Sequence, residues 1–185
     1  VEASGVVVAP GNQPEAALVT TQRVLGVGDL RTLVRALRHE APWPTSVEAP
    51  VRAEPVEGPD LSDVRGQRVA RYALEVAAAG AHHILLVGPP GSGKSMLARR
   101  LPGILPDLDP VDALEATRIR SAAGEDLPPG GLDLRPPWRA PHHGSSAAAQ
   151  VGGRSRTVRP GEVSLAHGGV LFLDELGEFA PTVLD

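Results

Sequence analysis

A short glycine-rich segment near the middle of the chain has the residue types and spacing that wrap a phosphate chain. It fits the pattern G-x-x-x-x-G-K-[ST] and reads Gly88-Pro89-Pro90-Gly91-Ser92-Gly93-Lys94-Ser95. The glycines allow backbone N–H groups to approach phosphate oxygens closely. The lysine can place its ammonium between the outer phosphates, and the serine offers a hydroxyl to Mg²⁺. The segment therefore predicts a site for a nucleoside triphosphate and its magnesium ion.

The alternative is a glycine-rich turn that matches by accident, because the chain contains 21 glycines. The use of lysine argues against this alternative. Lysine and arginine together number 18, and Lys94 is the only lysine among them. The bulky planar guanidinium of arginine cannot replace a compact ammonium in a phosphate cradle. A composition that avoids lysine elsewhere thus favours a specific role for Lys94.

Two adjacent carboxylates form a second group of residues that could take part in catalysis. Asp174 and Glu175 follow the apolar run Val170–Leu173, far downstream of the glycine-rich segment. We expect Asp174 to hold Mg²⁺ through its water shell and Glu175 to orient and polarise the attacking water, which predicts ATP hydrolysis. The alternative is that ATP acts only as a structural switch and that Glu175 is merely a capping carboxylate.

Regular elements must position these groups. The uniformly apolar run Ile84–Val87 is typical of a parallel strand buried on both faces. Met96–Leu101 is expected to be the helix that follows the glycine-rich segment, and Met96 is counted among the nucleotide-binding residues. Val170–Leu173 is expected to be a second buried strand. In open α/β sheets ligands bind at the carboxyl ends of the strands, which is where both motifs begin.

Further helices are predicted where a capping residue borders an apolar pattern. They are expected over 14–19, over Asp29–Arg38, over Arg68–Ala79 before Gly80, and from Asp109 toward Gly124, with β-like runs at 6–9 and 23–27. In the helix capped by Asp29, the apolar side chains share one face: Leu30, Leu33, Val34 and Leu37.

This pattern predicts an α/β chain in three parts. Residues 1–40 are too few to bury a core alone, so we expect them to complete a domain whose start is missing. Residues 41–59 are rich in proline and predict a linker, with an ordered loop packed across the next domain as the alternative. Residues 60–185 are expected to be the nucleotide-binding core. Both ends look cut, because the chain begins at Val1 without methionine and stops soon after Glu175.

Composition limits the possible functions. The chain has no cysteine, which excludes disulfides, thiolate zinc sites and cysteine nucleophiles. Its formal net charge is −4, so any attraction to nucleic acid must come from a local basic patch. There is no apolar run of roughly 20 residues and no secretory signal pattern, so we expect a cytoplasmic chain without a membrane partner.

One stretch supplies such a basic patch. No acidic residue occurs from Arg135 to Gly161, and its arginines are Arg135, Arg139, Arg154, Arg156 and Arg159. We expect this stretch to contact phosphates of DNA or of a neighbouring subunit's nucleotide, with Trp138 stacking on an exposed base. The alternative is a solvated arginine loop in an arginine-rich protein.

Two adjacent histidines lie within the same stretch. His142 and His143 invite a metal hypothesis. In an extended segment, however, neighbouring side chains point to opposite faces, so one ion could not easily bind both. A structural or substrate-contacting loop is therefore preferred.

Three strings of residues together resemble a known family. They are Val87–Pro106, Arg139-Ala140-Pro141-His142-His143, and Arg159–His167 running into the Asp174-Glu175 strand. The chain resembles the magnesium-chelatase-like AAA+ ATPases of the YifB/ComM type. Gly144 departs from that pattern, where threonine is expected, and Gly152–Thr157 differs in detail.

The resemblance implies an AAA+ P-loop sheet with flanking helices, truncated after the Asp174 strand and preceded by the end of a Lon/S5-like domain in residues 1–40. It also implies that Val64, Gly66 and Gln67 line the adenine pocket. A sheet strand, the sensor residues and the arginine finger would lie beyond Asp185, so we expect the 185-residue chain alone to be inactive.

The resemblance further implies a ring, expected to be a hexamer, with ATP bound between subunits. It leaves two kinds of work open: DNA remodelling such as branch migration in natural transformation, and the ATPase role in a magnesium chelatase. The Lon-like piece favours the first.

Overall fold

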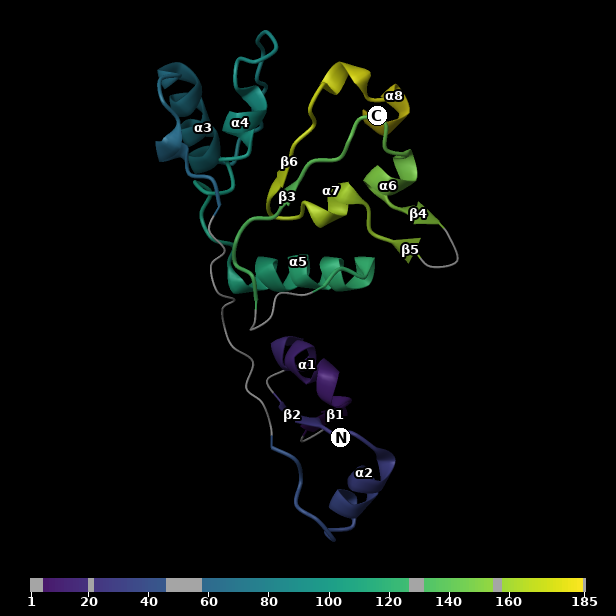
Figure 1. The fold of residues 1–185 in the computed structure, drawn as a ribbon. Coiled ribbons are helices and arrows are strands. Elements are labelled where there is room, and N and C mark those ends of the chain that lie inside the picture. The colour runs from purple at the N-terminus through teal and green to yellow at the C-terminus, as the bar shows by residue number, and fades with distance from the viewer. Residues whose placement is uncertain (1–4, 20–21, 46–57, 127–131, 155–157, 185) are drawn as a thin grey trace. The chain divides into compact units, whose positions relative to one another are not determined.

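The computed structural model describes residues 5–19, 22–45, 58–126, 132–154 and 158–184 (Figure 1). The chain divides into two compact units, Val1–Glu54 with Pro128–Asp133, and Pro55–Leu127 with Leu134–Asp185. The three-part domain division predicted from the sequence stays a prediction.

The first unit contains a strand–helix–strand motif. Strands β1 (Gly5–Val8) and β2 (Arg23–Gly26) pair in parallel, with Val6 opposite Val24. The connection holds the short 3₁₀ turn η1 (Pro10–Asn12) and helix α1 (Gln13–Val19), as parallel neighbours require a crossover. The predicted strands and helix are therefore confirmed to within one residue.

Helix α2 (Leu30–Leu37) follows and begins where the sequence predicted. Asp29 caps it by accepting a hydrogen bond of 2.7 Å from the Thr32 N–H, and this bond lowers the pKa of Asp29. The predicted apolar face is mostly exposed, because Leu30, Val34 and Leu37 are exposed and only Leu33 is half-buried. The two short strands of this unit offer too little surface to cover that face.

The second unit carries most of the helices and both remaining sheets. Its helical elements are η2 (Leu61–Asp63), α3 (Arg68–Gly80), α4 (Lys94–Ala98), α5 (Pro110–Ala123), α6 (Ala147–Val151), α7 (Glu162–Leu165), η3 (Leu176–Glu178) and α8 (Pro181–Leu184). Strands β3 (Trp138–Arg139) and β6 (Val170–Leu171) pair in parallel, and β4 (Gly153–Arg154) pairs with β5 (Val158–Arg159) in antiparallel fashion. Each sheet among the described residues has two strands, so the larger sheet implied by the resemblance stays a prediction.

Local caps explain the long helices of this unit. The Asp109 carboxylate accepts from the N–H groups of Val111 and Asp112 at the start of α5, and Gly124 ends it in the left-handed conformation. Helix α3 extends through Gly80, and the left-handed position belongs to Ala81, one residue later than predicted. Helix α4 runs over Lys94–Ala98 and gives way to tight turns, whereas Met96–Leu101 was predicted.

A small core joins the segment before α3 to the helix that follows the glycine-rich segment. Leu61 and Val64 pack with Leu74 of α3 and Leu97 of α4, and all four are almost fully buried. Figure 1 shows α3 and α4 side by side. Helix α4, which begins at the end of the glycine-rich segment, is thus fixed to α3 through this core.

The strand predicted at Ile84–Val87 is not formed in the structure. Ile84 and Leu86 pack against the core just described, but Leu85 and Val87 are 72% and 86% exposed. No segment among the described residues pairs with it in a sheet. A strand becomes buried on both faces only when neighbouring strands and helices cover it, and here only one face is covered.

Strand β6 forms over two of the four residues predicted. Its pairing with β3 is extended by a hydrogen bond of 2.8 Å from the Phe172 N–H to the Arg139 carbonyl. The close approach of the two strands requires glycine at position 169, because a Cβ on Gly169 would collide with the Pro137 carbonyl oxygen. The parallel pairing places the residues after β3 and the residues after β6 at the same edge of the sheet.

None of the helices in the described parts of the chain is both long enough and apolar enough to cross a membrane.

Candidate functional site

The glycine-rich segment makes two left-handed turns before α4. Gly91 and Gly93 have φ values of 76° and 86°, a region that glycine enters without the steric cost of a side chain. Gly93 is also the residue that caps the start of α4. The spacing of the glycines in the sequence therefore corresponds to backbone positions that need them.

The glycine-rich segment contains a lysine ammonium and several backbone N–H groups close together. The Lys94 ammonium donates to the carbonyl oxygens of Gly88, at 2.8 Å, and Pro89, at 3.0 Å. Within the described residues, the N–H groups of Gly93, Lys94 and Ser95 have no backbone acceptor. Donors of this kind at the start of a helix are available to an anion.

Ser95 and Asp174 meet although 79 positions separate them in the chain. The Ser95 hydroxyl donates a hydrogen bond of 2.9 Å to an Asp174 carboxylate oxygen. Ser95 lies in the first turn of α4, and Asp174 follows the strand segment of β6. Hydroxyl and carboxylate oxygens are ligands that Mg²⁺ accepts, and it usually completes its shell with water and phosphate oxygens. This pair of oxygens therefore fits a magnesium site.

His, Asp and Glu side chains in the described ranges form no group of three or more that could hold a metal ion. A magnesium ion at Ser95 and Asp174 would thus depend on oxygens of a bound nucleotide and of water.

Glu175 has an unusual backbone conformation. Its φ is 55°, in the left-handed region that a residue with a side chain adopts rarely, and its N–H donates to the Asp174 carboxylate at 3.1 Å. Its side chain remains 67% exposed. Such an outlier beside a strand end is typical of a functional position.

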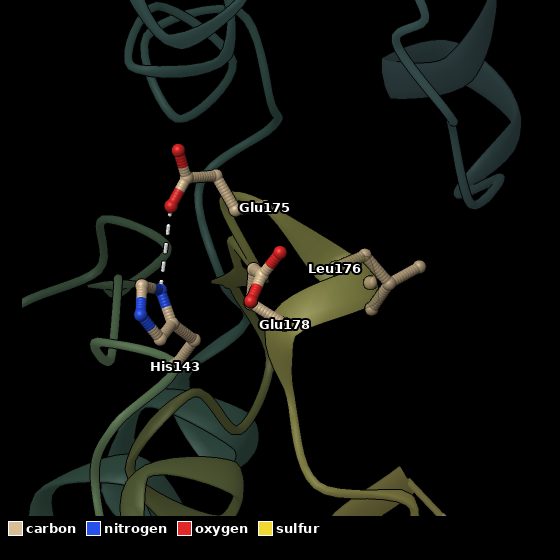
Figure 2. A pocket seen from close by; sticks show the side chains of 5 residues that line it. His143, Glu175, Leu176 and Glu178 are labelled. Atoms are coloured by element: carbon tan, nitrogen blue, oxygen red, sulfur yellow. Dashed lines mark ion pairs between the residues drawn. The ribbon is translucent and has the colours of Figure 1, made fainter.

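The Glu175 carboxylate is paired with His143. His143 Nδ1 lies 3.4 Å from a Glu175 carboxylate oxygen, and Figure 2 shows the two side chains pointing toward one another while Leu176 points away. Both residues line an open pocket of about 390 Å³ together with Leu176, Gly177 and Glu178. The pairing follows from the parallel β3–β6 sheet, whose two carboxyl ends lie at one edge.

The sequence did not predict this contact of His143, because it depends on the turn after β3 and on the pairing of β3 with β6. His142 and His143 were also predicted to lie in an extended segment. The chain instead turns at His143 and Gly144, and the two rings lie 4.1 Å apart between centroids. The expectation of opposite faces was therefore wrong, because a turn brings successive side chains together.

The predicted adenine-pocket residues have different environments. Val64 is almost fully buried in the core beside α3 and α4. Gly66 and Gln67 both have left-handed φ values, and the Gln67 side-chain amide donates to the Ser92 carbonyl at 3.0 Å. The structure therefore brings Gln67 to the glycine-rich segment.

Two residues of the basic stretch Arg135 to Gly161 already have partners within the protein. Arg139 donates to both carboxylate oxygens of Glu162, at 2.6 and 3.0 Å, and lies 2.9 Å from Glu125. The hydrogen bonds that Arg139 donates to Glu162 raise the pKa of Arg139 and lower the pKa of Glu162. Trp138 stacks on Phe172 with ring centroids 5.2 Å apart. Arg139 and Trp138 thus have partners within the protein.

The remaining arginines of this stretch have different surroundings. Arg159 in β5 is exposed, whereas Arg135 is partly buried and has an interaction of its own. The backbone of Arg154 forms β4, but its side chain and all of Arg156 lie outside the described residues. Of the five arginines, Arg159 is the described one that presents an exposed side chain without such an interaction.

Comparisons with known proteins place this chain in a family. The model of the family described as magnesium chelatase, subunit ChlI, matches residues 60–185, which is more than half of the chain. An uncharacterized protein of Mycobacterium tuberculosis strain H37Rv is 50% identical over 183 residues. The uncharacterized protein YifB of Escherichia coli is 43% identical over 182 residues, and the competence protein ComM of Haemophilus influenzae is 41% identical over 184 residues.

Each of these matches covers 97% of the chain but only 35% to 36% of the relative. The chain therefore spans about a third of the length of the curated relatives it matches. With its glycine-rich segment and the adjacent carboxylates inside the matched region, the chain belongs to the magnesium-chelatase-like family that includes YifB and ComM.

Proposed function

We propose that this protein binds ATP with Mg²⁺ and hydrolyses it as a subunit of a ring, expected to be a hexamer. The observation that carries the proposal is the hydrogen bond of 2.9 Å between Ser95 and Asp174. Two motifs far apart in sequence thereby meet at one point, beside a lysine and a set of backbone donors. A glycine-rich turn that matched by accident would have no reason to meet an acidic strand end.

The residues of the glycine-rich segment bind and orient the phosphates. Its free N–H groups and the Lys94 ammonium provide donors and positive charge beside the start of α4. Ser95 and Asp174 hold the metal. Magnesium bound there supplies positive charge that neutralises developing charge on the phosphate oxygens.

Glu175 accepts the proton of the attacking water or orients that water. A carboxylate in this role must be held near the phosphate in a defined direction. His143 contacts the same carboxylate, and its ring is itself packed against His142 and edge-on to the buried Phe179. The His143 contact therefore limits the orientations that the Glu175 side chain can take.

Phosphate release by the whole protein tests this proposal. Steady-state release that requires both ATP and Mg²⁺, and that stops when the metal is chelated, supports hydrolysis. Tight ATP binding without release would instead support the ATP-switched binding module, in which Glu175 has only a capping role. The whole protein is required because the chain spans only about a third of its relatives' length.

A second step of the proposal concerns the substrate of the ring. We propose DNA remodelling such as branch migration, supported by the exposed Arg159 in the β4–β5 hairpin and by the similarity to a protein named for competence. The family description also names magnesium chelatase, so the ATPase role in metal insertion into a porphyrin is the second candidate. A protoporphyrin metallation assay on the same preparation separates the two.

We expect the variant Arg154→Ala/Arg156→Ala/Arg159→Ala of the whole protein to bind DNA more weakly and with a flatter salt dependence. Each lost phosphate contact reduces the slope of log K against log salt by about 0.7 to 0.9. Loss of all three contacts therefore reduces the slope by about 2 to 3. The measurement is a salt-titrated binding assay with single-stranded and junction DNA, with and without ATP.

The matched control removes three exposed arginines from α2 and its end, Arg31, Arg35 and Arg38. It changes the net charge equally and should leave the slope at the wild-type value. Loss of ATP affinity and ring assembly with unchanged DNA binding would place these three arginines at a subunit interface. Failure of the wild-type protein to bind DNA at low salt would overturn the DNA proposal.

A further inference from the structure

Gln67 combines a strained backbone with a side chain that reaches the phosphate-binding segment. Its φ and ψ are 49° and 40°, the left-handed region that glycine, asparagine and aspartate tolerate better than glutamine does. It precedes the first residue of α3, yet its side chain makes no capping hydrogen bond there. Local helix chemistry therefore does not explain why a glutamine stands at this position.

The Gln67 carboxamide packs on one peptide group of the glycine-rich segment. Its Nε2 donates to the Ser92 carbonyl oxygen at 3.0 Å. A Cβ at Gly93 would lie 2.8 Å from the same nitrogen and 3.3 Å from the terminal methyl of Met96. Gly93 therefore leaves the space that the Gln67 amide occupies.

This contact fixes the direction of a neighbouring donor. No peptide bond within the described ranges is cis, and in a planar trans peptide the carbonyl and the following N–H point in opposite directions. Holding the Ser92 carbonyl toward Gln67 therefore turns the Gly93 N–H away from it. Among the described residues that N–H has no acceptor, so it is available to a ligand on the opposite side of the segment.

The support for Gln67 is itself firmly attached. Arg100, just after α4, donates to the Asp60 carbonyl at 2.8 Å, and Arg71 donates to the Val64 carbonyl at 3.3 Å. Leu61 and Val64 are buried against Leu97 of α4. The segment that carries Gln67 is thus fixed to α4, the helix that starts at the end of the glycine-rich segment.

We propose that Gln67 is a positioning residue that orients the Ser92–Gly93 peptide, so that the Gly93 N–H faces the phosphates of the nucleotide. The inference rests on the proposed ATP site and adds a role distinct from lining the adenine pocket. A residue that lines the pocket would read the base, whereas a residue that orients this peptide acts on phosphate binding whatever the base is.

The test uses the whole protein with Gln67→Ala and Gln67→Asn. Asparagine tolerates the left-handed conformation better than glutamine, but its amide is one methylene shorter and does not reach Ser92. Competition against a fluorescent ATP analogue gives dissociation constants for ATP, GTP and inorganic tripolyphosphate. We expect both variants to bind ATP and tripolyphosphate about tenfold more weakly, the effect of losing roughly one hydrogen bond, with an unchanged ratio of ATP to GTP affinity.

A second readout needs no ligand. Amide hydrogen exchange over residues 91–95 of the nucleotide-free protein should be faster in both variants, because the peptide loses its support. The matched control is Val69→Ala, two residues further along, whose side chain is 84% exposed. It should change neither the affinities nor the exchange.

The outcomes separate the inference from the proposed function. Wild-type protein that binds neither ATP nor tripolyphosphate overturns the proposed function. Normal wild-type binding with unchanged tripolyphosphate affinity in both variants overturns the role of Gln67 alone. A shifted ATP to GTP ratio with unchanged tripolyphosphate affinity assigns Gln67 to the adenine pocket instead.

Discussion

Lys94→Ala is expected to abolish measurable ATP binding by the whole protein. The Lys94 ammonium lies within 3.0 Å of two carbonyl oxygens of the glycine-rich segment. Lys94 is also the only lysine in the sequence. Removing it deletes a charge-assisted contact to the phosphates, and hydrogen bonds to charged groups contribute about 1.5 to 3 kcal/mol. One such contact corresponds to a loss of about 10- to 150-fold in affinity, and we expect calorimetry to show at least that loss.

Two further variants make this result specific. Lys94→Arg keeps the positive charge but replaces a compact ammonium by a planar fork, so it should also fail to bind. Arg99→Ala removes an exposed positive charge just after α4 and should bind as the wild type does. Equal unfolding temperatures of the three variants would exclude loss of the fold as the cause. Unchanged ATP affinity in Lys94→Ala would contradict the phosphate-binding assignment.

The features that the sequence predicted well are those decided by neighbouring residues. Helices α2 and α5 begin after Asp29 and Asp109 because a carboxylate next to the first turn accepts from its N–H groups. The glycines of the glycine-rich segment were informative for the same reason, since Gly91 and Gly93 occupy left-handed positions. Such signals require no knowledge of the rest of the fold.

The features that the sequence predicted poorly depend on distant partners. Whether Ile84–Val87 is buried on both faces depends on which strands lie beside it, and among the described residues none pairs with it. Arg139 lies in a stretch without acidic residues, but Glu125 and Glu162 on either side of that stretch both reach it. Counting charges along the stretch could not reveal these pairs.

The backbone conformations of two predicted site residues were beyond sequence reasoning for another reason. Gln67 and Glu175 have left-handed backbones, which neither residue type indicates. The His143–Glu175 pair arises from the turn at Gly144 and from the parallel register of β3 and β6. Only the folded arrangement brings these side chains together.

Glu175→Gln is expected to bind ATP with Mg²⁺ normally and to hydrolyse it much more slowly. The amide keeps the shape of the side chain but cannot accept a proton from water at neutral pH. General base catalysis typically contributes about 10² to 10⁴ in rate, so phosphate release should fall by roughly that factor. The measurement is single-turnover phosphate release by the whole protein, with ATP affinity measured on the same preparation.

Glu178→Gln is the matched control for this experiment. Glu178 lines the same pocket as Glu175 and is also exposed, but no ion pair joins it to His143 in the structure's described part (Figure 2). Its replacement removes an equal charge from the same surface, so a general effect of charge on the pocket would slow both variants. We expect slow release only in Glu175→Gln. Full turnover by that variant would remove Glu175 from the mechanism and leave ATP binding as the function of the site.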